Sequence, residues 1–179
     1  TATSPIWNLI TNQFEQIDVG YHSTPVFCDL DKDNDFDLTI GSSDSIIIYE
    51  NTGNANQYQF TRSSAISDEY SRHFIRYFDF DADGDLDRVV GTHYHFLFYE
   101  NAGQNQYILL EKTDILALPD NLSDLTMDFG DLDNDNDPDL VLFNTNSGIL
   151  YFENTGSLSQ MKFEQKYSYY MSIDVGHPN

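Results

Sequence analysis

The fold of this chain is decided by a nine-residue stretch with five aspartates, Asp29-Leu-Asp31-Lys-Asp33-Asn34-Asp35-Phe-Asp37. It recurs as Asp79-Phe-Asp81-Ala-Asp83-Gly84-Asp85-Leu-Asp87 and as Asp131-Leu-Asp133-Asn-Asp135-Asn136-Asp137-Pro-Asp139. We call these stretches ladders 1, 2 and 3. Carboxylates this close raise one another's pKa and resist ionising together unless a cation lies between them. A single copy is compatible with a solvated acidic turn, but three copies in register predict cation sites.

The spacing within each ladder favours calcium. Oxygen ligands at loop positions 1, 3 and 5, a backbone carbonyl at 7 and a later carboxylate suit a hard cation with about six to eight oxygen ligands. Position 6 must turn sharply, and it is Asn34, Gly84 or Asn136, residue types that tolerate a left-handed backbone. Magnesium prefers fewer protein ligands, and soft metals prefer His or Cys. We therefore expect up to three Ca²⁺ ions, one per ladder. The predicted metal-site residues are Asp29, Asp31, Asp33, Asp35, Asp37, Asp79, Asp81, Asp83, Asp85, Asp87, Asp131, Asp133, Asp135, Asp137 and Asp139.

An EF-hand, another calcium loop with similar early spacing, is excluded. It requires a bidentate Glu at position 12 and a helix on each side of the loop. Position 12 is Ile40, Val90 or Leu142, and the flanking residues are rich in the β-branched and aromatic types that favour strands.

Repetition extends beyond the ladders, which begin at residues 29, 79 and 131. Short apolar runs separated by Gly, Asn and Asp read as strands, and each ladder has one such run before it and three after it. The runs are 25–28, 38–41, 46–49 and 58–60 in the first copy, 74–78, 89–91, 96–99 and 107–110 in the second, and 125–127, 140–143, 149–152 and 161–163 in the third. Each repeat is predicted to be a four-stranded antiparallel unit with its calcium loop between strands 1 and 2.

Four-stranded units of about 50 residues are typical of β-propeller blades, so the fold class is all-β. We place the blades at about 21–63, 71–113 and 123–166 of a single partial propeller spanning 1–179. Residues 167–179 would start a next blade, because Ile17-Asp-Val-Gly20 recurs as Ile173-Asp-Val-Gly176. Three blades fall below the usual range of about four to eight. The chain is expected to be part of a larger propeller or to complete a ring with other copies.

At these residues the chain resembles the VCBS and FG-GAP type β-propeller repeats, which occur in integrin α-subunit heads and in many secreted or surface proteins. The resemblance covers roughly residues 17–176 and rests on Asp-x-Asp-x-Asp-(Gly/Asn)-x-x-Asp, Leu-x-(Val/Ile)-Gly and Tyr-Glu-Asn-x-Gly. It is closer to VCBS, because the Phe-Gly and Gly-Ala-Pro signatures are missing. It implies that positions 1, 3, 5 and 9 of each ladder bind Ca²⁺ through side chains and position 7 through its carbonyl. The third copy departs at Pro138, which lacks a backbone N–H, and at Phe143, which replaces a Gly.

Charge and composition limit the partners and the location. The formal net charge is −22, and three Ca²⁺ would bring it to about −16, which still repels nucleic acid and anionic membranes. No apolar run is long enough to insert in a membrane, and targeting signals are expected to lie outside this segment. The single Cys28 allows no internal disulfide and is expected in the core. Calcium sites of the extracellular class bind at roughly 10⁻⁴ to 10⁻³ M, which predicts an extracellular or cell-surface location.

The sequence leaves three classes of function open. The first is a structural, adhesion or assembly scaffold that binds a protein or glycan at the propeller rim, with self-association as a way to complete the ring. The second is a lectin-like propeller, for which Trp7, Tyr94, Tyr169 and Tyr170 are available although they do not recur in register. The third is part of a polysaccharide-degrading enzyme. No catalytic residues are predicted, because Glu15, Glu69 and Glu111 are not paired by any motif. His93 and His95 have the spacing of a possible metal pair but are interpreted as a solvent-facing or interblade pair. Asn121-Leu-Ser123 matches a glycosylation sequon.

Overall fold

The computed structural model describes residues 8–67, 74–92, 96–110, 126–144, 148–156 and 161–167. Within these ranges the secondary structure is twelve strands and one short 3₁₀ helix, η1 (Phe14–Gln16). The strands form three separate four-stranded antiparallel sheets, and within each sheet the strands are paired in chain order. This confirms the all-β fold class.

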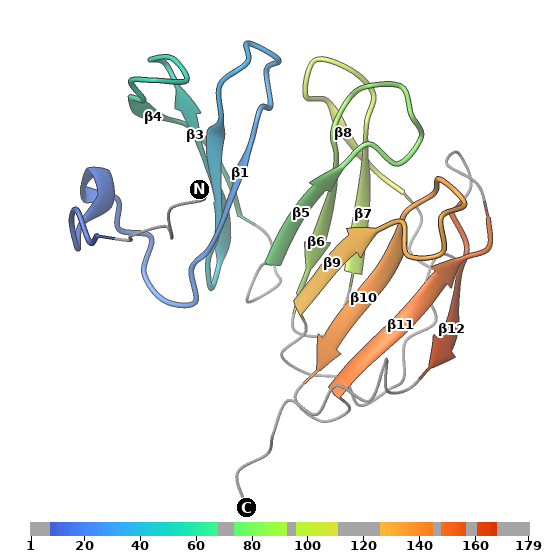
Figure 1. The fold of residues 1–179 in the computed structure, drawn as a ribbon. Coiled ribbons are helices and arrows are strands. Elements are labelled where there is room, and N and C mark those ends of the chain that lie inside the picture. Colours follow the sequence, from blue (N-terminus) through green and yellow to red (C-terminus); the bar gives the residue numbers. More distant parts are fainter. Residues whose placement is uncertain are drawn as a thin grey trace, which may run out of the picture.

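Each sheet corresponds to one predicted repeat (Figure 1). Sheet 1 contains β1 (Thr24–Cys28), β2 (Asp37–Gly41), β3 (Ser45–Asn51) and β4 (Phe60–Ser67). Sheet 2 contains β5 (Phe74–Phe78), β6 (Asp87–Gly91), β7 (Phe96–Asn101) and β8 (Tyr107–Leu109). Sheet 3 contains β9 (Thr126–Gly130), β10 (Asp139–Asn144), β11 (Gly148–Asn154) and β12 (Phe163–Tyr167). In every sheet the ladder connects the first strand to the second, as the sequence predicts.

The fourth strand of two sheets lies later than predicted. The sequence indicated 58–60 and 161–163, whereas β4 begins at Phe60 and β12 begins at Phe163. The cause in sheet 1 is the turn after β3, where the side-chain oxygen of Asn51 accepts hydrogen bonds from the N–H groups of Gly53 and Gln59. Strand pairing resumes only at Phe60, opposite Asn51. Most of β4 is exposed and polar, as suits an edge strand, so hydrophobicity did not reveal it.

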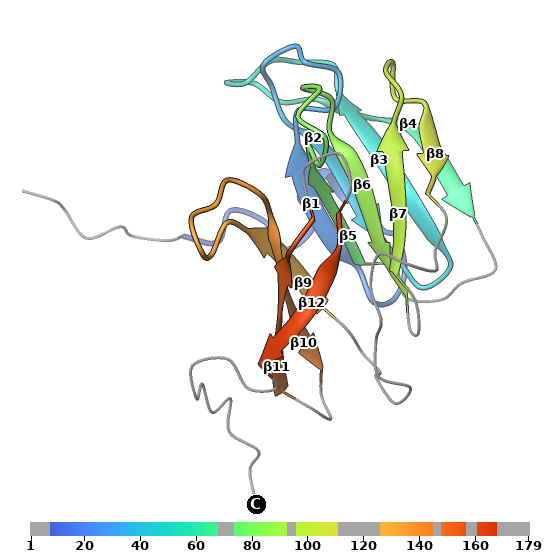
Figure 2. The ribbon, with the colours of Figure 1, turned by 90° about the vertical axis from the view of Figure 1, so that its right-hand side faces the viewer.

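The three sheets are stacked in the manner of propeller blades, with sheet 2 between sheets 1 and 3 (Figures 1 and 2). The first strands β1, β5 and β9 are the elements through which neighbouring sheets approach most closely. In the part of the chain that the structure describes, the three sheets form an open stack and not a closed ring (Figure 1). This arrangement is that of a partial propeller.

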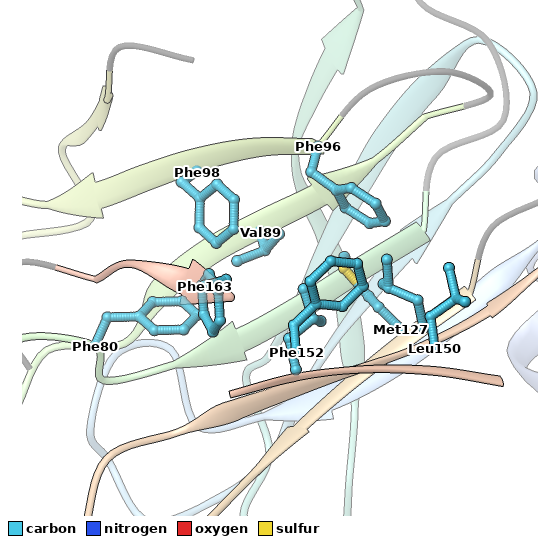
Figure 3. Packing of buried hydrophobic residues seen from close by; sticks show 10 residues of the cluster. Phe80, Val89, Phe96, Phe98, Met127, Leu150, Phe152 and Phe163 are labelled. Atoms are coloured by element: carbon cyan, nitrogen blue, oxygen red, sulfur yellow. The ribbon is translucent and has the colours of Figure 1, made fainter. Parts of the chain in front are cut away.

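Sheet 2 is buried on both faces. Successive side chains of a strand point to opposite faces, so Val89 packs on sheet 3 and Val90 packs on sheet 1. The larger core lies between sheets 2 and 3 (Figure 3) and consists of Phe80, Val89, Phe96, Phe98, Met127, Leu140, Leu142, Leu150, Phe152 and Phe163. The smaller one lies between sheets 1 and 2 and consists of Ile46, Ile75, Val90 and Leu97. Stability of the stack is therefore concentrated on one side of sheet 2.

A truncation in the larger core tests this distribution. Leu140 is fully buried, so Leu140→Ala leaves a cavity and is expected to lower the free energy of unfolding by about 2–5 kcal/mol. Ile108→Ala is the control, because Ile108 is 54% exposed and its loss should cost less than about 0.5 kcal/mol. Urea unfolding in saturating calcium measures both. Equal effects of the two substitutions would contradict the assigned core.

Candidate metal centres

Each ladder folds into a tight loop that gathers three carboxylates. One oxygen from each member of a group lies within 4.8 Å of the others, and the groups are Asp29, Asp31 and Asp33; Asp79, Asp81 and Asp87; and Asp131, Asp133 and Asp135. Positions 1 and 3 thus contribute in all three ladders, position 5 in ladders 1 and 3, and position 9 in ladder 2. The position-7 side chains Asp35, Asp85 and Asp137 belong to none of these groups. Which of the fifteen aspartates bind an ion stays a prediction.

The loop backbone is held in left-handed turns. Position 6 has φ of 71° at Asn34, 87° at Gly84 and 75° at Asn136, which confirms the sharp turn inferred from residue type. Position 4 is also left-handed, at Lys32 and Ala82 among others, which the sequence did not indicate. These turns aim successive N–H groups at the first aspartate of the ladder. In ladder 1 the two oxygens of Asp29 accept from the N–H groups of Asp33 (3.1 Å) and Asn34 (3.1 Å).

The aspartate at position 9 of each ladder, its last residue, connects the loop to its sheet. It is nearly inaccessible to solvent, and its two oxygens accept backbone hydrogen bonds from two different segments. One donor is position 2 of the same ladder, and the other is the Asn that ends the third strand. The bonds run to Asp37 from Leu30 (3.0 Å) and Asn51 (2.9 Å), to Asp87 from Phe80 (2.8 Å) and Asn101 (2.8 Å), and to Asp139 from Leu132 (3.0 Å) and Asn154 (2.9 Å).

The Asn at the end of the third strand passes this connection on to the next hairpin. Its N–H donates to the aspartate at position 9, while its side-chain oxygen accepts from the N–H of the turn glycine, at Gly53, Gly103 and Gly156. In sheets 1 and 3 the same oxygen also accepts from the returning strand. In the sequence, Glu-Asn-x-Gly indicates only the repeat, and this role of the Asn side chain was not predicted. The signal that could have revealed it is that Asn and Gly recur at fixed distances from the ladder.

Several carboxylate oxygens in the loops lack a partner, which is the test of whether the residues suit a cation. Oδ1 of Asp35, of Asp79 and of Asp137 is buried without a hydrogen bond among the described residues. Burial and the neighbouring Asp33 raise the pKa of Asp31, and burial and Asp135 raise the pKa of Asp137 to about 6. Buried unpaired carboxylates are costly. An oxygen-seeking divalent cation would compensate this charge, and the all-oxygen donor set fits Ca²⁺.

A salt bridge connects two of the ladders. The Nζ of Lys32, at position 4 of ladder 1, pairs with the carboxylate of Asp85, at position 7 of ladder 2. The contact raises the pKa of Lys32. Ladder 3 closes in the same way as the others despite Pro138, since Leu132 still donates to Asp139.

Of the other residues singled out in the sequence, Cys28 and Glu15 lie within the described residues. Cys28 is buried, and burial together with Asp37 and Asp29 raises the pKa of its thiol to about 12, which agrees with a core role. Glu15 lies in η1. The remainder lie outside the described residues and comprise Trp7, Glu69, His93, Tyr94, His95, Glu111, Asn121, Tyr169 and Tyr170.

A comparison with protein families gives one description for most of this region. The FG-GAP-like repeat matches residues 29–90 and again residues 79–142. Each match begins at the first aspartate of one ladder and runs through the next ladder, and together they span more than half of the chain. Neither the curated proteins nor the solved structures include a match. Among the described residues, no helix has the length and apolar character needed to cross a membrane.

The pKa shifts predict an unusual pH dependence for the metal-stripped protein. Asp137 titrates near pH 6 in the folded state and near 3.9 when unfolded, so between these values the folded state binds more protons. Stability without metal should therefore rise as the pH falls from 7 to 5. With millimolar calcium it should fall, because protons compete with the ion for the same oxygens. Melting temperatures at both pH values check this, and parallel trends with and without calcium would contradict it.

The aspartates at positions 9 and 3 of a ladder should differ in what they stabilise. Asp139→Asn places an amide N–H₂ against a backbone donor, so it is expected to lower stability by about 1–3 kcal/mol both with calcium and with EDTA. Asp133 is exposed, and partial desolvation within the loop and the charge of Asp135 raise its pKa. Asp133→Asn should weaken calcium binding while leaving the EDTA-treated protein as stable or more stable. Calorimetric titration and melting curves of the two variants separate these roles.

Proposed function

The chain belongs to the FG-GAP-like repeat family, and from this premise we propose that it is a calcium-stabilised β-propeller module of a secreted or cell-surface protein. Its blades act as a structural, adhesion or assembly scaffold. The observation that carries the proposal is the group of three converging carboxylates in each ladder, beside a buried carboxylate oxygen without a partner among the described residues. Such oxygens make the loops unfavourable without a cation, so ion binding contributes directly to folding.

An extracellular setting would keep these sites filled. Loops of this kind in extracellular modules bind calcium at roughly 10⁻⁴ to 10⁻³ M, far above cytosolic calcium levels. The strongly acidic surface, with a net charge of −22, supports a soluble and well-solvated module. We propose a non-catalytic role, since the carboxylates brought together among the described residues are those of the ladders, which the ions would occupy.

An exposed aromatic face supports assembly with a further blade. On the outer side of sheet 1, Phe27 is 54% exposed and Phe36 is 64% exposed. Phe27 forms a ring contact with Phe60, at 6.2 Å between centroids. The same pair occurs in sheet 3 as Phe129 and Phe163, at 6.3 Å, and there both rings pack in the core against sheet 2. The outer face of sheet 1 therefore has the residues of an interblade surface.

The carbohydrate-binding alternative rested in the sequence on Trp7, Tyr94, Tyr169 and Tyr170. All four lie outside the described residues, so their positions lend it no support. A further blade or a second copy at the outer face of sheet 1 is the better supported partner, because this exposed face has a counterpart inside the fold.

Calcium should strongly raise the melting temperature. At a free concentration about 100 times Kd, one site contributes about 2.7 kcal/mol, which for a chain of this size corresponds to roughly 5–10 °C. Magnesium at the same concentration and ionic strength is the control and should give a much smaller shift. A melting curve that does not respond to calcium would overturn the proposed role.

Assembly is tested by light scattering in millimolar calcium. If the outer face of sheet 1 binds another blade, the wild-type chain should be larger than a monomer, and Phe27→Glu should return it to a monomer with an unchanged calcium-dependent melting shift. Ile108→Glu is a matched exposed control on β8. A monomeric wild-type chain would argue against self-association and leave the scaffold role to other partners.

A further inference from the structure

Sheet 2 departs from the repeat at three neighbouring positions, all of which are apolar in sheets 1 and 3. The residue after position 9 of ladder 2 is Arg88, and it pairs across the strands with Tyr77. The residue opposite the Asn that ends the third strand is Tyr107. The equivalent residues are Leu38, Phe27 and Phe60 in sheet 1 and Leu140, Phe129 and Phe163 in sheet 3. In sheet 2, the polar residues Tyr77, Arg88 and Tyr107 thus replace residues that are apolar in the other two sheets.

Between sheets 2 and 3 the same positions are filled by a dense apolar core. Leu140 is fully buried and Phe163 is 7% exposed. Phe129 makes an edge contact with Phe80 at 5.1 Å between ring centroids. The ring centroids of Phe98 and Phe163 lie 6.3 Å apart (Figure 3). Apolar residues at these three positions therefore pack into a core between two neighbouring sheets.

Between sheets 1 and 2 there is instead a pocket of about 290 Å³, lined in part by Arg88 and Tyr107. Arg88 is only 4% exposed, yet its Nε and Nη1 have no hydrogen-bond partner among the described residues. Its guanidinium lies 4.2 Å from the ring centre of Tyr107 and 4.8 Å from that of Tyr99. Cation–π contacts use the flat face of the guanidinium and leave Nε and Nη1 without an acceptor in the described part of the chain. Buried donors of this kind require an acceptor in the pocket.

The rest of the pocket wall limits the acceptor to a singly charged group on a hydroxylated ligand. Asp31, Asp37 and Glu50 also line the pocket, and Asp37 already accepts from two backbone N–H groups. A dianion such as phosphate would be repelled, whereas a single carboxylate can accept from the unpaired N–H groups of Arg88. Ser64 and Asn105 add a hydroxyl and an amide, which suit sugar hydroxyls as donors and acceptors. Ile66 offers an apolar surface to ring C–H groups. The volume lies at the small end of the roughly 300–1,000 Å³ typical of ligand sites, which corresponds to a single ring.

We propose that this pocket binds a uronic acid unit of a glycan. The carboxylate of the sugar accepts hydrogen bonds from Arg88, and its hydroxyls bond to Glu50, Ser64 and Asn105. The site goes beyond the scaffold role, and it rests on that role only in that Leu30, Asp31 and Asp37 of ladder 1 form part of its wall.

The test is ligand-observed NMR or calorimetric titration of the calcium-loaded chain with D-glucuronate and D-galacturonate. We expect saturable binding of at least one uronate and at least tenfold weaker binding of glucose, galactose, acetate and sulfate. Monosaccharides are used because polyuronates themselves bind calcium. No saturable uronate binding would overturn the proposal, and so would acetate or sulfate binding as well as the uronates, since the pocket would then be a general anion site.

Arg88→Leu is the decisive variant, because it restores the residue found at Leu38 and Leu140. It should reduce uronate binding at least tenfold while leaving the calcium-dependent melting shift intact. Arg62→Leu is the matched control, because it removes the same charge from an exposed position on β4. Equal loss of binding in both variants would show a bulk charge effect and overturn the site.

A second variant keeps the test independent of the folding of the first. Asn105 has a left-handed backbone, with φ of 57°, so Asn105→Gly removes the amide without strain. It should weaken uronate binding at least threefold, and unchanged binding would contradict the assigned contacts. Failure of uronate binding with a normal calcium response would reject this site alone, whereas loss of the calcium response would reject the scaffold role alone.

Discussion

The structure depends on one carboxylate per repeat that accepts backbone hydrogen bonds from two separate segments. The aspartate at position 9 of each ladder fixes the loop to the end of the third strand, 14 or 15 residues further along the chain. This bond pattern places the other ladder carboxylates beside one another, because the loop between them is too short to let them separate. The same interaction that orders each sheet therefore creates the concentration of negative charge that calls for a cation.

The sequence predicts the sheets well because their determinants are local and repeated. Strand β5 lies where its apolar run indicated, and each ladder lies between the first and second strands. The late start of β4 was not predicted, because the turn that delays it depends on the side chain of Asn51 and not on hydrophobicity. The ladder residues were recognised, but the separate role of Asp37, Asp87 and Asp139 follows from burial, which spacing alone does not give. Arg88 escaped notice because it stands inside an otherwise apolar strand.

The two interfaces of sheet 2 show how a repeat fold can carry a local specialisation. Each repeat supplies the same strand positions, so a change in one copy alters one interface and leaves the others packed. Sheet 3 keeps Leu140 and Phe163 in a dense core, whereas the corresponding Arg88 and Tyr107 line a pocket. The cost of a buried guanidinium is tolerated because the other face of the same blade supplies most of the packing.

The salt bridge between Lys32 and Asp85 makes the three loops unequal. Asp85 is not one of the clustered carboxylates of ladder 2, but Asp83 and Asp79 also raise the pKa of Lys32, so a cation bound in ladder 2 would repel its ammonium group. Linkage is reciprocal, so filling ladder 1 must alter the affinity of ladder 2 by the same factor. Through this contact, ion binding at ladder 1 and ion binding at ladder 2 would depend on each other, although the three loops share one motif.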